Sequence, residues 1–147
     1  VALRQPLMTF APSQLILFNY LIGNCDNHLK NLSILYAPDW RSFTLAPAYD
    51  LVSTTYFARF SREMGMAIGE HSDIDEVTTA DFAILAEQLG VGMKVLRSVA
   101  DVFAGRAISA LRNEGARLGG EGYGAAPYIA DDIEEDIAPR LEVLASL

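Results

Sequence analysis

The stretch that decides the fold of this chain is Gly23-Asn24-Cys25-Asp26-Asn27-His28-Leu29-Lys30-Asn31, followed further on by Pro47-Ala48-Tyr49-Asp50. Residues that favour turns dominate both segments, which are therefore predicted to be loops. Asp26 and Asn31 stand in a D-x-x-x-x-N pattern, a spacing that can present a carboxylate and an amide toward one point. The rest of the chain is predicted to support this loop.

Composition and charge limit the classes of protein to which the chain can belong. Its 147 residues suffice for one domain with its own core. Apolar residues make up 51% of the chain, but charges and glycines interrupt every candidate for the roughly 20-residue apolar run of a membrane helix. The net charge of -8, with scattered Lys and Arg residues, argues against direct nucleic-acid binding. The single cysteine excludes an internal disulfide and favours the cytoplasm.

The elements beside the loop are predicted from apolar patterns and turn residues. A loop-like segment is expected through Pro6 to Pro12, followed by a helix that Ser13 caps and that is buried on most sides up to Ile22. Two short strands, 32–36 and 43–45, flank turn residues and predict a β-hairpin. This hairpin would return the chain so that Asp50 lies beside Asp26.

The remainder of the chain is predicted to be mainly helical. We expect a short strand at 64–69, a solvated loop around His71, a helix from Thr79 or Asp81 to Leu89, and a longer helix from about 93 to 118. The predicted inward stripe of the longer helix is Val95, Leu96, Val99, Val102, Phe103, Ile108 and Leu111. The division is a domain at 1–118, a flexible link at 119–130, and a helix at 131–147 that Pro139 shortens or bends and that packs on the same domain.

The loop residues fit the chemistry of phosphoryl transfer. That reaction needs a carboxylate to orient or deprotonate the incoming hydroxyl, and oxygen ligands to hold Mg²⁺ against the phosphates of ATP. Asp26 suits the first task, while Asn31 and Asp50 suit the second because Mg²⁺ prefers oxygen ligands. His28 could face the phosphate or hold the loop in shape, and Lys30 could approach a phosphate or be an exposed charge. On spacing alone, Asp26 and Asn31 could equally be turn-forming residues.

The quoted stretch resembles the catalytic loop of the HipA family of bacterial serine/threonine protein kinases. Residues 45–53, LAPAYDLVS, resemble the metal-binding segment of that family, and the similarity runs from about Ser13 to Leu118. The resemblance implies a mainly α fold with a small β-hairpin, the C-terminal lobe of an atypical protein kinase. It also implies Asp26 as the base, Asn31 and Asp50 as Mg²⁺ ligands, and ATP as the phosphate donor.

The resemblance further implies a toxin of a toxin–antitoxin pair. Such kinases phosphorylate a cytosolic protein, and their partner is a small helix-turn-helix antitoxin, HipB-like, through which they reach DNA indirectly. The chain departs from a complete kinase, because no Gly-rich phosphate loop or strand lysine precedes Asp26. We therefore expect a C-terminal portion of a longer protein, which alone binds ATP weakly and transfers phosphate poorly.

Two other functions fit the same residues. The pattern D-x-H-x-x-N at Asp26, His28 and Asn31 also resembles loops of phosphoinositide kinases, which would make the chain part of a lipid or small-molecule kinase. Those loops are normally followed by D-F-G, which is absent here. A non-catalytic helical interaction module is the third reading. Cys25 could be a reactive thiol or a small buried residue that fills a tight turn.

Overall fold

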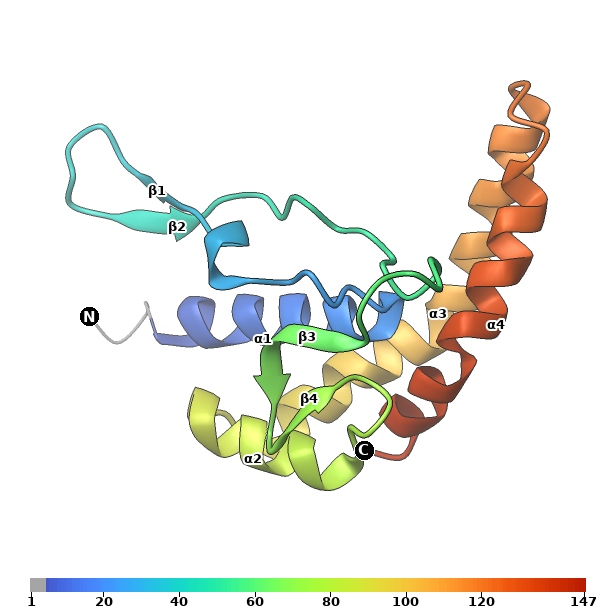
Figure 1. Ribbon diagram of the computed structural model, residues 1–147. Helices are drawn as coiled ribbons and strands as arrows, with labels where there is room; N and C mark the ends of the chain where they lie inside the picture. Colours follow the sequence, from blue (N-terminus) through green and yellow to red (C-terminus); the bar gives the residue numbers. More distant parts are fainter. Residues whose placement is uncertain (1–4) are drawn as a thin grey trace.

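The computed structural model describes the backbone of residues 5–147 and the side chains of residues 12–147. Its elements follow the chain in the order α1 (Gln5–Ile22), a 3₁₀ turn η1 (Leu29–Asn31), β1 (Ile34–Tyr36), β2 (Phe43–Leu45), β3 (Glu63–Ile68), β4 (His71–Asp73), α2 (Thr79–Leu89), α3 (Met93–Gly120) and α4 (Ala126–Ala145). Figure 1 shows α1 across the centre, the β1–β2 hairpin extending from one end, and α3 and α4 side by side. The predicted class, mainly α with a small β-hairpin, is confirmed.

Helix α1 begins earlier than predicted. It runs from Gln5 to Ile22, so residues 5–12 of the expected loop-like segment are helical, and residues 1–4 lie outside the described part of the chain. Pro12 has no backbone N–H, so α1 lacks one backbone hydrogen bond at this position. The helix continues through Pro12 because tertiary packing can outweigh that loss. Ser13 is fully buried within the helix rather than at its start, so the predicted cap is wrong.

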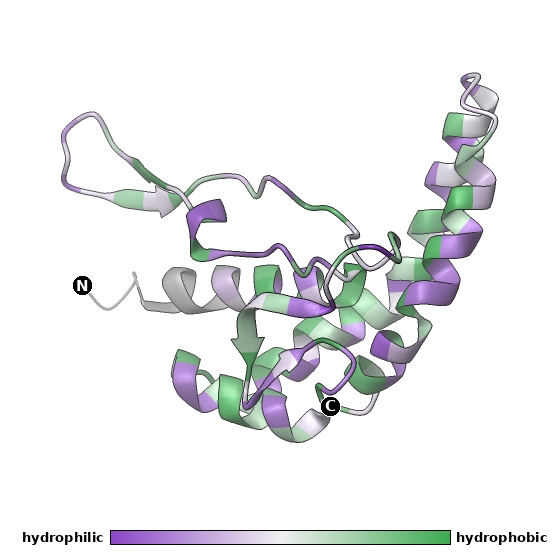
Figure 2. Ribbon diagram, in the orientation of Figure 1, coloured by the Kyte–Doolittle hydropathy of each residue, from purple (hydrophilic) through white to green (hydrophobic). Residues whose placement is uncertain are grey.

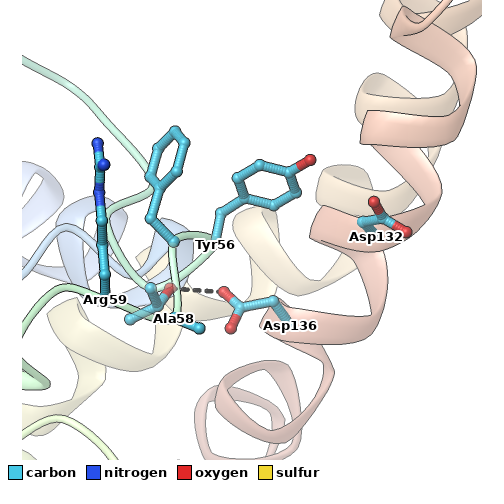
Figure 3. A pocket seen from close by; sticks show the side chains of 7 residues that line it. Tyr56, Ala58, Arg59, Asp132 and Asp136 are labelled. Atoms are coloured by element: carbon cyan, nitrogen blue, oxygen red, sulfur yellow. Dashed lines mark hydrogen bonds between the residues drawn. The ribbon is translucent and has the colours of Figure 1, made fainter.

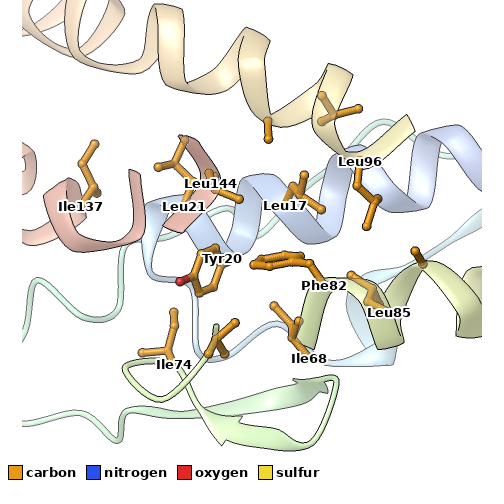
Figure 4. Close-up of a cluster of buried hydrophobic side chains, with 14 of the residues drawn as sticks. Leu17, Tyr20, Leu21, Ile68, Ile74, Phe82, Leu85, Leu96, Ile137 and Leu144 are labelled. Atoms are coloured by element: carbon orange, nitrogen blue, oxygen red, sulfur yellow. The ribbon is translucent and has the colours of Figure 1, made fainter. Parts of the chain in front are cut away.

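The hydrophobic core surrounds α1, as its dense apolar pattern predicts. Leu17, Tyr20 and Leu21 are at most 2% exposed, and the Tyr20 ring packs edge-on against Phe82 of α2 at 5.2 Å between centroids. The core draws on every helix and on the segment after β4 (Figure 4); among its members are Ile68, Ile74, Val77, Leu85, Leu96, Val99, Ile137 and Leu144. The helix that carries the loop is therefore a rigid support.

The chain forms two antiparallel hairpins. In the first, Ile34 pairs with Leu45 and Tyr36 with Phe43, which confirms the predicted strands. In the second, β3 confirms the predicted strand near 64–69, but β4 occupies residues around His71 that were expected to form a solvated loop. The sequence does not predict β4, because its three residues are all polar and show no alternation of apolar and polar side chains. Figure 2 shows hydrophilic residues along η1 and hydrophobic ones on β1.

Helices α2 and α3 begin and end close to the predicted residues. Thr78 caps α2 in a capping box with Asp81, and Gly90 ends the helix in a left-handed conformation. Leu96 and Val99 of α3 are buried as predicted, but Val102 is 51% exposed and does not belong to the inward stripe. Val102 lies on the solvent-facing side of α3, whereas its neighbour Phe103 packs against the core.

Helix α4 is longer than predicted. It runs from Ala126 to Ala145 and stays continuous through Pro139, so residues 126–130 are helical rather than part of a flexible link. Only residues 121–125 join α3 to α4, and the two helices lie antiparallel along much of their length (Figure 1). Within the described residues, no helix combines the length and the hydropathy needed to cross a membrane.

Candidate active site: the loop at residues 23–31

The loop begins at Gly23, where α1 ends. Gly23 has φ +72°, and a Cβ atom at this position would lie 1.9 Å from Oγ1 of Thr55, so the close approach requires glycine. The Gly23 carbonyl accepts hydrogen bonds from the backbone N–H groups of Thr54 and Thr55 at 3.0 and 3.1 Å, and from the Thr54 hydroxyl at 2.9 Å. The start of the loop is thus attached to the segment that follows residues 45–53.

Asn24 connects the loop directly to Asp50. Its side-chain amide donates to Oδ1 of Asn19 at 2.8 Å and to the backbone carbonyl of Asp50 at 2.9 Å. The β1–β2 hairpin therefore does return the chain to the loop, two residues before Asp26. Asp50 itself is exposed and adopts φ +59°, an uncommon conformation for a residue other than glycine.

Asp26 and Asn31 are linked within the loop. The Asn31 side-chain amide donates to the backbone carbonyl of Asp26 at 3.1 Å, and the Asn31 backbone N–H donates to the carbonyl of His28 at 2.9 Å. Asn31 is buried, whereas the Asp26 side chain is 60% exposed. This arrangement leaves the Asp26 carboxylate accessible to a reactant and holds Asn31 in place beneath it.

Tyr49 attaches the second segment to the end of the loop. Its hydroxyl lies 2.8 Å from the Ser33 hydroxyl and donates to the backbone carbonyl of Lys30 at 3.1 Å. The backbone N–H of Ala46 donates to the Ser33 carbonyl at 2.8 Å. The Lys30 side chain is exposed. Residues 46–49 therefore contact residues 30–33.

A pocket of about 480 Å³ opens beside Asp26 and His28. His28 Nε2 lies 3.1 Å from Oδ1 of Asp26, and the imidazole covers Gly65, where a Cβ atom would be 2.4 Å from Nδ1. The pocket walls also include Cys25, Thr54 and residues 60–61 and 63–65. Of the five predicted site residues, this pocket brings together Asp26 and His28, while Lys30, Asn31 and Asp50 lie outside its lining.

Cys25 is a buried residue of the turn. It is 5% exposed, its thiol donates to the Arg62 carbonyl at 3.6 Å, and burial raises the pKa of the thiol. Its backbone N–H donates to the Thr54 hydroxyl at 2.8 Å, and its carbonyl accepts from the N–H of Gly65 at 2.7 Å. These contacts favour the structural reading of Cys25 over the reactive one.

The chemistry of the donor atoms fits Mg²⁺ better than a transition metal. Among the described side chains, no three His, Cys, Asp or Glu residues gather closely enough to hold an ion by themselves. The predicted ligands are an amide oxygen and a carboxylate, and Mg²⁺ is usually held by one or two such oxygens together with substrate phosphates and water. Oδ1 is the atom of the Asn31 amide that could bind the ion, and the bond from Nδ2 to the Asp26 carbonyl would fix its orientation.

The sequence did not predict which residues of the last helix contact the segments around the site. Arg140 and Asp136 of α4 form a buried ion pair with 2.5 Å between Nη2 and Oδ2, and both contact Thr55. Their spacing of four residues on one helix was a usable signal for a pair. No sequence pattern indicated that this pair would meet a loop some 80 residues earlier in the chain.

The comparisons with known proteins identify the family. The model of the HipA-like C-terminal domain matches residues 11–111. The serine/threonine-protein kinase toxin HipA of Shewanella oneidensis is 34% identical over 98 residues, which cover 67% of this chain and 21% of that protein. The Sinorhizobium fredii protein Y4mE is 38% identical over 81 residues, which cover 55% of this chain and 19% of Y4mE. The chain thus spans about a fifth of the length of these relatives.

A solved structure has the same fold. In the complex of Shewanella oneidensis HipA with HipB and operator DNA, the matching chain superposes with a TM-score of 0.67 at 24% sequence identity, over 91% of this chain and 30% of that one. At this level of identity the match supports the fold alone. With more than half of its residues matched by the family model, this chain belongs to the family of HipA-like C-terminal domains.

Proposed function

We propose that the chain is the C-terminal portion of a serine/threonine protein kinase that transfers the γ-phosphate of ATP to a protein hydroxyl. Asp26 acts as the base that orients and deprotonates the acceptor hydroxyl, and Asn31 and Asp50 would hold Mg²⁺. The ion, when bound, would neutralise charge on the phosphates. His28 lies beside Asp26 and Lys30 is the penultimate residue of the loop, where both could contact the nucleotide phosphates.

The observation that carries this proposal is the attachment of the two segments to each other. Asn24 binds the Asp50 carbonyl at 2.9 Å, Tyr49 binds the Lys30 carbonyl at 3.1 Å, and Asn31 binds the Asp26 carbonyl at 3.1 Å. If Asp26, Asn31 and Asp50 only formed turns, the loop at 23–31 would not need to be bonded to residues 45–53 both near its start and near its end. Positioning of this kind is most of what a protein contributes to phosphoryl transfer.

The biological role proposed for the full-length protein follows its relatives. HipA of Shewanella oneidensis is named a toxin, and its solved structure contains HipB and operator DNA. We propose that this protein is likewise the cytoplasmic toxin of a pair, with a helix-turn-helix antitoxin as partner and with DNA contacted only through that partner. The net charge of -8 on this chain agrees with an indirect contact to DNA.

The test is Asp26→Asn in the full-length protein. Transfer of phosphate from Mg-ATP to a protein acceptor should fall by about 10²–10⁴-fold, the usual contribution of a general base. Asp39→Asn is the matched control, because Asp39 is an exposed carboxylate in the turn of the β1–β2 hairpin, where it accepts a bond from the Arg41 N–H. Undiminished transfer by the Asp26 variant would refute the proposed role.

A further inference from the structure

Helix α4 reaches the end of α1 and the segment beside the active-site loop through a largely buried ion pair that lies beyond the residues matched by the family model. Arg140 is 3% exposed and the Asp136 side chain is 17% exposed, with 2.5 Å between Nη2 and Oδ2. Burying two charges is costly unless their remaining polar atoms are also satisfied. Here the additional partners come from α1 and from the segment that follows residues 45–53.

Arg140 holds the end of α1 and Thr55 at the same time. Its Nε donates to the Leu21 carbonyl at 3.1 Å, in the last turn before the loop, and its Nη2 donates to Oγ1 of Thr55 at 3.3 Å. The Thr55 hydroxyl donates in turn to Oδ2 of Asp136 at 2.5 Å. A planar guanidinium can serve several acceptors in fixed directions, which a lysine ammonium on a flexible stem cannot do equally well.

Thr54 and Thr55 extend these contacts to the loop itself. Both backbone N–H groups donate to the Gly23 carbonyl, and the Thr54 hydroxyl accepts from the N–H of Cys25 at 2.8 Å. Cys25 directly precedes Asp26. The segment that carries Asp50 and the loop that carries Asp26 therefore meet at Gly23, and α4 contacts that junction through Thr55.

A cavity of about 710 Å³ lies beside the junction, lined by residues 55–59 and by Asp132 and Asp136. Figure 3 shows Asp136 projecting from α4 toward the segment with Tyr56 and Arg59, and Asp132 further along the same helix. Arg62 adds a longer contact to Asp136 at 3.7 Å while binding Asp75 through two hydrogen bonds of 2.7 and 2.6 Å. Besides its backbone bond to the Gly23 carbonyl, Thr55 is thus held by the hydrogen bonds between its hydroxyl and the side chains of Asp136 and Arg140.

We propose that Asp136 and Arg140 are positioning residues for phosphoryl transfer. They fix Asp26 relative to Asp50 through Thr55 and Thr54, without contact with the nucleotide. The proposal rests on the function proposed above. Its physical basis is that a displacement of about 1 Å at a reacting group can cost about 10²-fold in rate.

The decisive variant is Thr55→Val in the full-length protein. It removes the hydroxyl but leaves Asp136 and Arg140 paired, so no buried charge loses its partner. We expect kcat to fall by about 10- to 100-fold with little change in the KM for ATP. Amide hydrogen exchange at residues 23–31 should become faster. Arg140→Lys, which keeps the charge but not the set of donors, should give the same pattern.

Arg112→Met is the matched control. Arg112 also contacts α4, through hydrogen bonds of 2.7 and 2.5 Å to Glu134, but the Arg112 side chain is 63% exposed and this pair joins α4 to α3 rather than to Thr55. The kcat and the amide exchange rates of the Arg112→Met variant should equal those of the wild type. Unchanged kcat and unchanged exchange in a folded Thr55→Val protein would overturn the proposal, as would a lower unfolding temperature with unchanged kcat.

The two proposals fail in different ways. If the proposed function is wrong, the wild type shows no transfer that depends on Asp26, while exchange in the Thr55→Val protein still reports whether α4 restrains the loop. If only the positioning role is wrong, transfer depends on Asp26 but not on Thr55 or Arg140.

Discussion

The side-chain amide of Asn31 donates a hydrogen bond of 3.1 Å to the backbone carbonyl of Asp26. This bond closes the D-x-x-x-x-N loop on itself and gives the spacing of the motif a physical meaning. The nitrogen holds the residue that carries the proposed base, and the oxygen of the same amide remains for Mg²⁺. One side chain would therefore perform two tasks.

Substitution of Asn31 should separate these tasks. Asn31→Asp keeps an oxygen ligand but cannot donate to the Asp26 carbonyl, so kcat in the full-length protein should fall by about 10- to 100-fold. Asn31→Ala loses both functions and should also raise the Mg²⁺ concentration needed for half-maximal transfer. Titration of activity with Mg²⁺ checks this expectation, and an unchanged requirement in the alanine variant would count against Asn31 as a ligand.

Gly65→Ala should displace His28 without unfolding the protein. The added Cβ atom would lie 2.4 Å from Nδ1 of His28, so the ring must move away from Asp26. We expect reduced phosphate transfer and a shifted ring signal for His28 by NMR. Gly105→Ala is the control, because nothing lies within 4 Å of its Cβ position in the middle of α3, and alanine there should stabilise the helix by about 0.5–1 kcal/mol. Equal activity of both variants would contradict the proposed role of His28.

Asp81 should make stability depend on pH. Burial alone would raise the pKa of Asp81, but hydrogen bonds from the N–H groups of Thr78 and Glu70 and from His71 hold it well below its usual range. The hydrogen bond to Asp81 also raises the pKa of His71. Because the pKa of Asp81 is lowered in the folded state, its carboxylate stabilises the fold above about pH 4, and this stabilisation is lost as the pH falls. Because the pKa of His71 is raised, its imidazolium stabilises the fold below about pH 6.5, and that stabilisation is lost as the pH rises.

Asp81→Asn removes both contributions. The free energy of unfolding of the 147-residue chain should fall by about 1–3 kcal/mol near neutral pH, the usual cost of a broken buried hydrogen-bond set. Urea unfolding should show that the free energy of unfolding of the wild type falls between about pH 5 and pH 3, and that it falls less in the variant. The same decline in both proteins would show that Asp81 does not govern the acid sensitivity.

Cys25 should react slowly with thiol reagents. The thiol is buried and its raised pKa keeps it protonated near neutral pH, while only a thiolate is an effective nucleophile. Alkylation of the folded chain should be much slower than alkylation in urea. Similar rates in the two conditions would mean that the turn opens readily and that Cys25 is available for chemistry.

Local patterns were enough to predict the elements that depend on neighbours in sequence. The helix from the dense apolar run before Gly23, the strands on both sides of 37–42, and the helix from Thr79 to Leu89 all appear in the structure. The predictions based on prolines were wrong. The first helix was expected to begin after Pro12 and the last helix to be shortened or bent at Pro139, but both prolines lie inside continuous helices. In each case tertiary packing outweighs the loss of one backbone hydrogen bond.

The candidate site was predictable only in part. The motif indicated Asp26, Asn31 and Asp50, because their spacing and residue types reflect the chemistry. Contacts between distant segments left no trace in the local pattern, so the roles of Thr54, Thr55, Arg140 and Asp136 became visible only in the folded chain. Strand β4 was missed for a related reason, since its pairing with β3 and the bond from His71 to Asp81 are tertiary contacts.

We propose that Asn31 and Asp50 bind the same nucleotide-bound Mg²⁺ beside Asp26. A crystal structure of the full-length protein with Mg²⁺ and a non-hydrolysable ATP analogue would test this arrangement. Oδ1 of Asn31 and a carboxylate oxygen of Asp50 should then lie at about 2.0–2.1 Å from one ion, with phosphate oxygens completing its coordination. An ion held by other residues, with Asn31 and Asp50 turned away from it, would refute the proposed site.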